Sequence, residues 1–336
     1  MKVINKSIYA ITLAINCFFC HANGELLESQ AITNTQFELT QVKFTQAQVQ
    51  QSIEEIIEVL NNEYIYPDKV ERLVKELRKI KRVRAIQYIN NKAIFMRDVG
   101  ELLRRTSRDG YIDLLLVKSA LIIGDSLEYQ YQQQKSNFAF EQARVLENNI
   151  GYLKINHFFQ NKEAESVAEN AFNLLKGTKA VIIDLREASE GSIEFAQYLM
   201  SYFIESKTLL CQMIYQRQEK QHEIWSISDI GDREFKRDYP VFILTSSFVT
   251  SAAEFFSYTL KHLNKAVIIG EKTMGVAKWS QEISVNEWLK IKLPVAIPVS
   301  PITQSNWEGE GVVPDYETDA DSSFALALKL AKASIH

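Results

Sequence analysis

The architecture of this chain can be worked out from one stretch, Val241–Gly275, which reads VFILTSSFVTSAAEFFSYTLKHLNKAVIIGEKTMG. It begins with a short, almost wholly apolar run, Val241–Thr245, which predicts a buried strand. A turn follows, and Ala252–Leu263 has the apolar spacing of a helix. Ala266–Ile269 is a second apolar run and predicts another strand. A buried strand, a helix and a buried strand in this order indicate parallel strands joined by a helical crossover.

The same alternation continues on both sides of this stretch. Further strands are predicted at Ile112–Val117, Ala139–Val145, Asn149–Ile155, Ala180–Leu185, Leu209–Tyr215, His222–Ile227, Gln281–Val285 and Leu289–Ile297. Further helices are predicted at Ala164–Leu175, Ile193–Ile204 and Ser322–Ala333. We therefore predict an α/β core domain at 109–336 with a largely parallel sheet. Because ligands in such sheets gather at the carboxyl ends of the strands, we expect functional residues after Ile155, Asp184 and Leu244.

The residues at 45–108 have a helical pattern instead. Apolar residues recur at helical spacing in Val49–Leu60 and Val70–Leu77, and a third run covers Ile94–Leu103. Arg108–Gly110 is a turn signal that closes this region. We therefore predict a small N-terminal helical bundle in front of the core domain.

Ser251, Ala252, Ala253 and Glu254 open the helix within the first stretch. A serine at this place has its hydroxyl near the free N–H groups and the positive end of the helix dipole. That environment suits a nucleophile whose attack creates a negative charge. The same tetrapeptide is also a capping box, in which the serine and glutamate side chains bind each other's backbone amides. From these four residues alone, both interpretations stay open.

Three other segments complete an ordered set of motifs. Asn149–Phe158 reads NIGYLKINHF, Ala180–Glu187 reads AVIIDLRE, and Asn306–Glu317 reads NWEGEGVVPDYE. Together with the Ser251 segment, they resemble the tail-specific (C-terminal-processing) serine peptidases. The matching family motifs are an Ile-Gly-Tyr-Leu-x-Ile strand, an Ile-Asp-Leu-Arg strand, a Ser-Ala-Ala/Ser-Glu turn and a terminal Gly-Val-x-Pro-Asp signature. The resemblance covers roughly Thr45 to the C-terminus.

This resemblance implies a crotonase/ClpP-like core of repeated β-β-α units. It also implies hydrolysis of peptide bonds by acyl transfer, with Ser251 as the attacking residue and a polypeptide as the substrate. The helical region at 45–108 resembles the N-terminal domain of the branch similar to interphotoreceptor retinoid-binding protein. We recognise no PDZ-like insertion between Gly110 and Asn149, and that segment is too short to hold one.

The general base is the first departure from the family pattern. A serine hydroxyl needs a base to ionise at neutral pH. The family's lysine aligns with Val276, and Lys278 lies two positions further along. In the tricorn-like and retinoid-binding-protein-like branches, an Asp-Gly-His motif often supplies a histidine, but this chain has Tyr111 there. His157, at the end of a predicted strand, is the best remaining imidazole, so the candidates are Lys278, His157 and Tyr111.

The oxyanion hole is the second departure. Family members typically follow Asp-Leu-Arg with Asn-Gly-Gly-Gly-Ser, because glycine lets backbone N–H groups approach the substrate. This chain keeps only the last glycine, Gly191, in a loop that also contains Ser189. We expect the amides of Gly191 and Ala252 to bind the oxyanion. Near the C-terminal signature, Glu308 is placed to orient a base, as in triad-like relays, although it fits an exposed charged loop equally well.

These departures leave other functions open. Val276, Tyr111 and Glu190 replace a lysine, a histidine and a glycine of the catalytic pattern, and Glu190 adds negative charge beside the expected oxyanion. A catalytically degraded homologue that binds a peptide or a small apolar ligand is therefore the main alternative. A crotonase-type acyl-CoA enzyme fits the superfamily, but it does not fit the terminal signature.

Composition excludes several other classes. The formal net charge of −4 over 336 residues gives no reason to expect binding to nucleic acid or to an anionic membrane. The few histidines and cysteines are scattered, so we expect no metal site, and no phosphate-binding loop or other cofactor motif is present. Cys211 lies in an apolar run, where we expect a buried, inert thiol.

The N-terminus predicts export. Two lysines precede a short apolar run at Ser7–Cys20, and Cys20, His21 and Ala22 form a cleavage site with small residues at the −3 and −1 positions. Residues 1–22 therefore resemble a secretory signal peptide, and 23–44 a polar lead-in to a periplasmic or secreted protein. The apolar run is too short for a comfortable membrane span, so we expect none in the mature chain, and an uncleaved anchor is the alternative.

Overall fold

The computed structural model describes residues 44–82, 88–117, 123–228, 230, 235 and 239–335. The predicted signal peptide and all of the polar lead-in except Phe44 lie outside the described residues. The chain divides into two compact units. The N-terminal unit comprises Met1–Asn61, Pro67–Val117 and Glu282–Lys292. The core unit comprises Asn62–Tyr66, Lys118–Gln281 and Leu293–His336.

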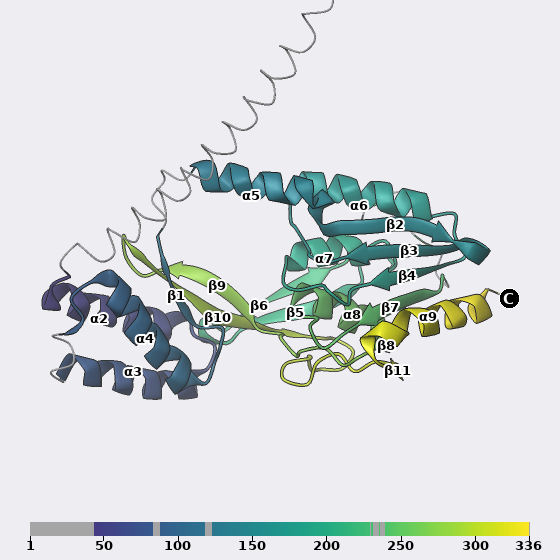
Figure 1. The fold of residues 1–336 in the computed structure, drawn as a ribbon. Helices are drawn as coiled ribbons and strands as arrows, with labels where there is room; N and C mark the ends of the chain where they lie inside the picture. The colour runs from purple at the N-terminus through teal and green to yellow at the C-terminus, as the bar shows by residue number, and fades with distance from the viewer. Residues whose placement is uncertain are drawn as a thin grey trace, which may run out of the picture. The chain divides into compact units, whose positions relative to one another are not determined.

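In the part that the structure describes, the N-terminal unit is built around three helices and a strand pair (Figure 1). The helices are α2 (Gln46–Glu63), α3 (Pro67–Arg82) and α4 (Lys92–Ser107). Asn91 sets the start of α4, because its side chain accepts a hydrogen bond from the Ile94 amide at 2.9 Å. Strand β1 (Asp113–Leu116) pairs antiparallel with β10 (Leu289–Val299). The helical N-terminal region predicted from the sequence is confirmed.

The core unit contains a six-stranded sheet in the order β11-β8-β7-β4-β3-β2. Its strands are β2 (Phe140–Leu146), β3 (Ile150–Ile155), β4 (Ala180–Asp184), β7 (Val241–Thr245), β8 (Val267–Gly270) and β11 (Tyr316–Glu317). Only β2 is antiparallel to its neighbour. The register pairs Lys154 with Asp184 and Asp184 with Leu244, so the carboxyl ends of β3, β4 and β7 meet at one edge. The predicted α/β class with a largely parallel sheet is confirmed.

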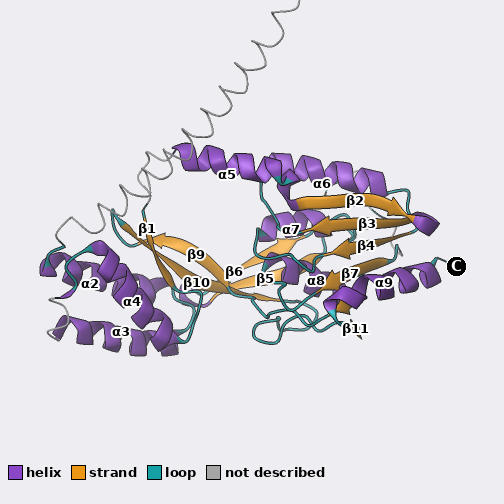
Figure 2. Ribbon diagram, in the orientation of Figure 1, coloured by secondary structure: helices purple, strands orange, loops and turns teal. Residues whose placement is uncertain are grey.

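Helices cover both faces of this sheet (Figure 2). They are α6 (Lys162–Leu175), α7 (Ile193–Met200), α8 (Ala252–His262) and α9 (Ala320–Ser334). On one face, Ala327 and Ala331 of α9 pack with Ile182 of β4. On the other face, Leu175 of α6 packs close to Gly151 of β3, where an added Cβ would lie 3.2 Å from the Leu175 side chain. Strand alternation thus separates the two layers.

A smaller antiparallel pair, β5 (Leu209–Tyr215) and β6 (Lys220–Trp225), forms a second sheet with the end of β10. Strand β9 (Trp279–Ser284) also pairs with β10. Cys211 in β5 is 1% exposed, which confirms the expected burial, and burial raises its pKa to about 12. No described helix is both long and apolar enough to cross a membrane. The described residues also hold no cluster of histidine, cysteine and acidic side chains suited to a metal ion.

The structure departs from the predicted elements in two helices. The helix predicted at Ile193–Ile204 ends at Met200, and the Gln197 carbonyl in its last turn accepts from Ser201 Oγ at 2.7 Å. Helix α5 (Ile123–Lys135) was not predicted. Its sequence, IGDSLEYQYQQQK, is too polar for apolar periodicity to reveal it.

A buried charge cluster fixes the carboxyl end of β4. Asp184 is fully buried and accepts from Tyr152 Oη at 2.7 Å. It also accepts from Arg186 Nε at 2.9 Å and Arg186 Nη2 at 2.6 Å. A third guanidinium nitrogen of Arg186 donates to the Ala320 carbonyl at the start of α9, at 2.7 Å. The cluster therefore joins β3, β4 and α9 directly below the loops that follow the strands.

We predict that Asp184→Asn lowers the free energy of unfolding by about 2–4 kcal/mol at pH 7, because it leaves the Arg186 charge without its partner. Burial opposes ionisation of Asp184, but the Arg186 and Tyr152 bonds outweigh it and lower its pKa. A lowered pKa gives stability that is complete above the ordinary value of about 3.9 and lost as the pH falls through the lowered value. The deficit of the variant should therefore shrink at strongly acid pH.

Urea denaturation at pH 7 and under strongly acid conditions measures both effects. Asp98→Asn is the matched control, because Asp98 pairs with Arg97 at 2.7 Å on the exposed surface of α4, where such pairs contribute little. Equal losses in the two variants would contradict a stabilising role for the buried cluster.

Candidate active site

Ser251 lies where the chain turns from β7 into α8, at the edge where the strand ends meet. Its backbone has φ 57° and ψ −117°, a left-handed region that costs a non-glycine residue about 1–3 kcal/mol. A sharp strand-to-helix turn with the serine in a strained conformation is the geometry of a nucleophile elbow. This positive φ could not be predicted from the residues, because a serine at this position is also typical of an ordinary helix cap.

The buried Glu254 carboxylate is the centre of the hydrogen-bond network around this turn. It is fully buried and accepts from the Ser251 amide at 2.9 Å, which is the return bond of the predicted capping box. It also accepts from Thr273 Oγ1 at 2.5 Å and from the amides of Gly275 and Val276 at 2.7 and 2.8 Å. Burial raises the pKa of Glu254, and these four donors oppose that rise.

The turn that carries Val276 is therefore held directly against the serine turn. The same carboxylate oxygen, Glu254 Oε2, accepts from the Ser251 and Val276 amides. A lysine is expected at position 276 from the family resemblance, and the backbone at that position is in place beside Ser251. The capping and nucleophile interpretations of the tetrapeptide are thus compatible, because the capping glutamate also positions the neighbouring turn.

The C-terminal signature segment forms hydrogen bonds with the other side of this turn. Trp307 Nε1 donates to the Val276 carbonyl at 3.0 Å, and the Gly309 amide donates to the Gly275 carbonyl at 2.9 Å. Gly275 has φ +89°, and a Cβ there would lie 2.9–3.0 Å from backbone atoms of Gly309 and Gly311. Glycine is required at this close approach.

Lys278 is held by Glu308. Its Nζ lies 2.8 Å from Glu308 Oε1 and 5.5 Å from the centre of the Tyr66 ring, and its side chain is 10% exposed. Glu308 also accepts from the Ala277 amide at 2.9 Å.

His157 follows β3 and lies on the loop that follows β4. Its Nδ1 is 2.9 Å from the Ser189 carbonyl, and its ring packs 4.2 Å from that of Phe159. A carbonyl oxygen can only accept, so we assign the proton to Nδ1, which leaves Nε2 as the basic nitrogen of the neutral ring. Burial lowers the pKa of His157. Ser189 thus orients the imidazole through its carbonyl.

The loop after β4 also borders the serine turn. The Thr250 amide donates to the Ala188 carbonyl at 3.4 Å, and the Glu190 amide donates to Thr250 Oγ1 at 3.1 Å. Glu190, whose side chain is exposed, therefore lies beside Thr250, the residue that precedes Ser251.

Gly191 and Ala252 are the predicted oxyanion donors. Gly191 has φ +120°, and a Cβ there would lie 2.6–2.8 Å from Phe158, so no other residue fits without a shift. Neither the Gly191 nor the Ala252 amide donates a hydrogen bond to another described residue. Both N–H groups are therefore available to an incoming oxygen, one from each of the two loops in contact.

Tyr111 belongs to the N-terminal unit. It follows α4, and its amide donates to Asp109 Oδ1 at 3.1 Å. Its assignment as a base stays a prediction.

Comparisons with known proteins agree with the motifs. Residues 149–318 match the model of peptidase family S41. The carboxy-terminal processing protease CtpA of Bacillus subtilis (strain 168) is 28% identical over 156 residues, which cover 46% of this chain and 32% of the relative. The chain thus spans about a third of the length of the curated relatives it matches.

Solved structures support the same fold. A candidate peptidase from Parabacteroides merdae superposes with a TM-score of 0.59 at 16% identity, covering 84% of this chain and 96% of the other. A candidate S41 protease from Bacteroides fragilis gives a TM-score of 0.51 at 21% identity over 58% of each chain. The family model covers half of the chain, including Ser251 and the loops that contact its turn, and so this chain belongs to peptidase family S41.

Proposed function

We propose that this chain is an exported serine-type peptidase that hydrolyses peptide bonds by acyl transfer through Ser251. The observation that carries the proposal is the strained Ser251 turn at the head of α8, which Glu254 ties to the turn expected to carry a base. Strain of this kind persists only where surrounding bonds enforce it, and it is typical of active sites. Family membership supports the same reaction class.

In this reaction the Ser251 hydroxyl attacks the substrate carbonyl, and the amides of Gly191 and Ala252 stabilise the negative charge that forms on its oxygen. A base removes the hydroxyl proton and returns it to the amine as the C–N bond breaks, which leaves an ester on Ser251. The same base then activates a water molecule that hydrolyses this ester, releases the carboxylic acid and restores the serine. Among the candidates, the contacts favour His157, whose Nε2 is basic in the assigned tautomer. Lys278 is less suited, because its ion pair with Glu308 stabilises its protonated form.

Two exposed apolar side chains beside the site support an apolar segment of a polypeptide as the ligand. Phe248 is 73% exposed in the turn before Ser251, and Met274 is 54% exposed. The two segments are joined, because the Met274 amide donates to the Val249 carbonyl at 3.1 Å. Large exposed apolar groups at a site favour binding of apolar partners.

A second candidate function is binding without catalysis. Val276 stands where the family places its lysine, and the Lys278 amine two positions further along forms an ion pair with Glu308. Glu190 adds negative charge beside the expected oxyanion. A peptide or a small apolar ligand would then occupy the same apolar surface at Phe248 and Met274.

A fluorophosphonate probe separates the two functions. We expect the purified protein to be labelled and to cleave unfolded protein substrates, and we expect Ser251→Ala to abolish both. Ser247→Ala is the matched control, because Ser247 is an exposed serine in the same turn and should leave labelling unchanged. Absence of both labelling and cleavage would favour the binding function.

We predict that His157→Gln slows labelling by about 10²-fold or more, the usual contribution of a general base. The base must be neutral, and burial lowers the pKa of His157 below its ordinary value of about 6.5. The labelling rate should therefore fall as the pH drops, with a midpoint below the ordinary histidine value of about 6.5. Lys278→Met and Tyr111→Phe serve as comparisons; a loss confined to either one would assign the base to that residue instead.

We predict that Val276→Lys increases the rate of Ser251 labelling at least tenfold, because its backbone is already fixed beside Ser251 by Glu254. The gain should rise with pH as the new amine loses its proton. Val276→Met is the control, since methionine has a similar length and no basic nitrogen. Equal labelling of the two variants would show that the turn does not aim this side chain at the hydroxyl.

A further inference from the structure

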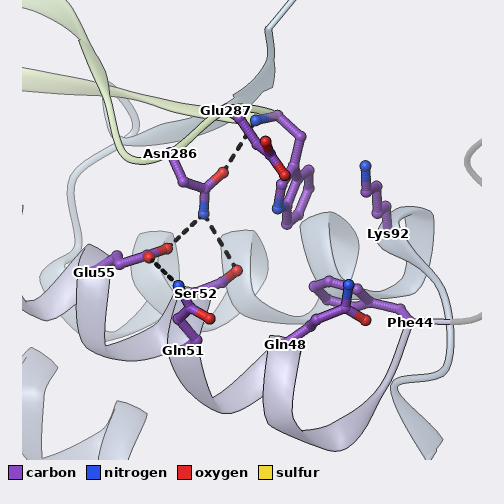
Figure 3. Close-up of a pocket in the computed structure, with 9 residues that line it drawn as sticks. Phe44, Gln48, Gln51, Ser52, Glu55, Lys92, Asn286 and Glu287 are labelled. Atoms are coloured by element: carbon purple, nitrogen blue, oxygen red, sulfur yellow. Dashed lines mark hydrogen bonds between the residues drawn. The ribbon is translucent and has the colours of Figure 1, made fainter.

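The N-terminal unit holds a pocket of about 440 Å³ (Figure 3). It is lined by Phe44, Gln48, Gln51, Ser52, Glu55, Lys92, Asn286, Glu287 and Trp288. These residues come from Phe44 just before α2, from α2 itself, from the first residue of α4 and from the segment between β9 and β10. The volume lies within the range of about 300–1,000 Å³ that is usual for small-molecule sites.

Asn286 holds the pocket in shape. Its amide nitrogen donates to Glu55 Oε2 at 2.6 Å and to Ser52 Oγ at 3.3 Å (Figure 3). Its amide oxygen accepts from the backbone N–H groups of Trp288 and Leu289 at 3.2 and 3.0 Å. All of these bonds exist without a ligand, so the polar wall of the pocket is pre-formed.

An aromatic wall lies beside this polar one. The Trp288 ring meets Phe44 and Phe95 edge to face, at centroid distances of 5.3 and 5.7 Å. Lys92 Nζ lies over the indole, 4.9 Å from its centre. The indole is thus fixed by contacts on several sides and offers a rigid apolar surface.

The charges in the pocket disfavour a charged ligand of either sign. Glu55 and Glu287 would repel an anion, and Lys92 would repel a cation that approached the indole. The other polar groups are the neutral amides of Gln48 and Gln51 and the hydroxyl of Ser52. Gln51 Nε2 already donates to Glu55 Oε1 at 2.8 Å, and Gln48 Oε1 accepts from Thr45 Oγ1 at 2.9 Å. The Gln51 amide oxygen, the Gln48 amide nitrogen and the second lone pairs of the Glu55 oxygens face the ligand. Together the lining offers strong acceptors and strong donors close to one another, next to an apolar ring.

We propose that this pocket binds a neutral saccharide, of one or two sugar rings. Each sugar hydroxyl donates and accepts at the same atom, so neighbouring hydroxyls can serve Glu55 and Lys92 at once. The C–H face of a sugar ring is apolar and packs against an indole. The pocket would hold the N-terminal unit to a glycan, and this role is independent of the chemistry at Ser251.

A peptide segment is a poorer fit. Peptides that add to a sheet edge or line a groove rely on main-chain hydrogen bonds from the protein. Here the main-chain amides of Trp288 and Leu289 are already used by Asn286. The groups that remain are side chains, and they are grouped around a compact pocket rather than repeated along an extended edge.

Isothermal titration calorimetry of the full chain with cellobiose and with N,N′-diacetylchitobiose tests the proposal. At least one disaccharide should bind saturably, with an affinity that does not change between low and high salt, because the ligand is neutral. Glu55→Gln should weaken binding about tenfold or more, since it removes the charge from a hydrogen bond to a hydroxyl. Glu58→Gln, on the exposed face of the same helix, should leave binding unchanged.

Lys92→Met provides a second variant in case Glu55→Gln perturbs α2, and the helical circular dichroism of each variant checks its fold. Ser251→Ala should bind as the unchanged chain does, which separates this site from the proposed catalysis. The proposal would be overturned if neither disaccharide gave saturable heat. It would also be overturned if Glu55→Gln and Lys92→Met, both folded, bound like Glu58→Gln, or if an acetylated tripeptide amide bound in place of the sugars.

Discussion

The arrangement around Ser251 depends on one buried carboxylate. Taking an ionised glutamate out of water is costly unless its oxygens are hydrogen-bonded. Glu254 meets this condition with donors from the serine turn, from Thr273 and from the turn at Gly275 and Val276. Loss of any of these donors would leave the carboxylate less well satisfied, so the three segments hold their positions together. The strained backbone of Ser251 is one of the conformations that this network maintains.

The network preserves geometry even where a functional group has been replaced. Glu254 accepts a hydrogen bond from the backbone amide of Val276, and any residue other than proline offers the same amide. Thr273 connects this network to the C-terminal signature, because its hydroxyl accepts a hydrogen bond from the Val312 amide at 2.7 Å. The backbone at position 276 is therefore held in the same place whichever side chain it carries, and a change of residue type there leaves the hydrogen bonds of the site intact.

The sequence predicted most of the core, and the reasons are physical. Strands such as β4 and β7 are buried along their whole length, so their apolar runs were recognisable. Helix α5 was missed because it is polar. Ion pairs and pockets could not be predicted from the sequence, because they are formed by residues that lie far apart in it. Lys278 and Glu308 are 30 positions apart, and the partners Glu55 and Asn286 are 231 positions apart.

The pairing of β1 with β10 has a consequence for how the protein is made. Asp113 pairs with Lys292, so the N-terminal unit takes one of its strands from a segment deep inside the sequence of the core unit. During synthesis from the N-terminus, its helices can form early, but its strand pair cannot close until residue 292 has left the ribosome. By then the strands β2 to β8 of the main sheet have already been made. The unit that comes first in the sequence is thus completed only after most of the core has been synthesised, and long-range pairings of this kind slow folding.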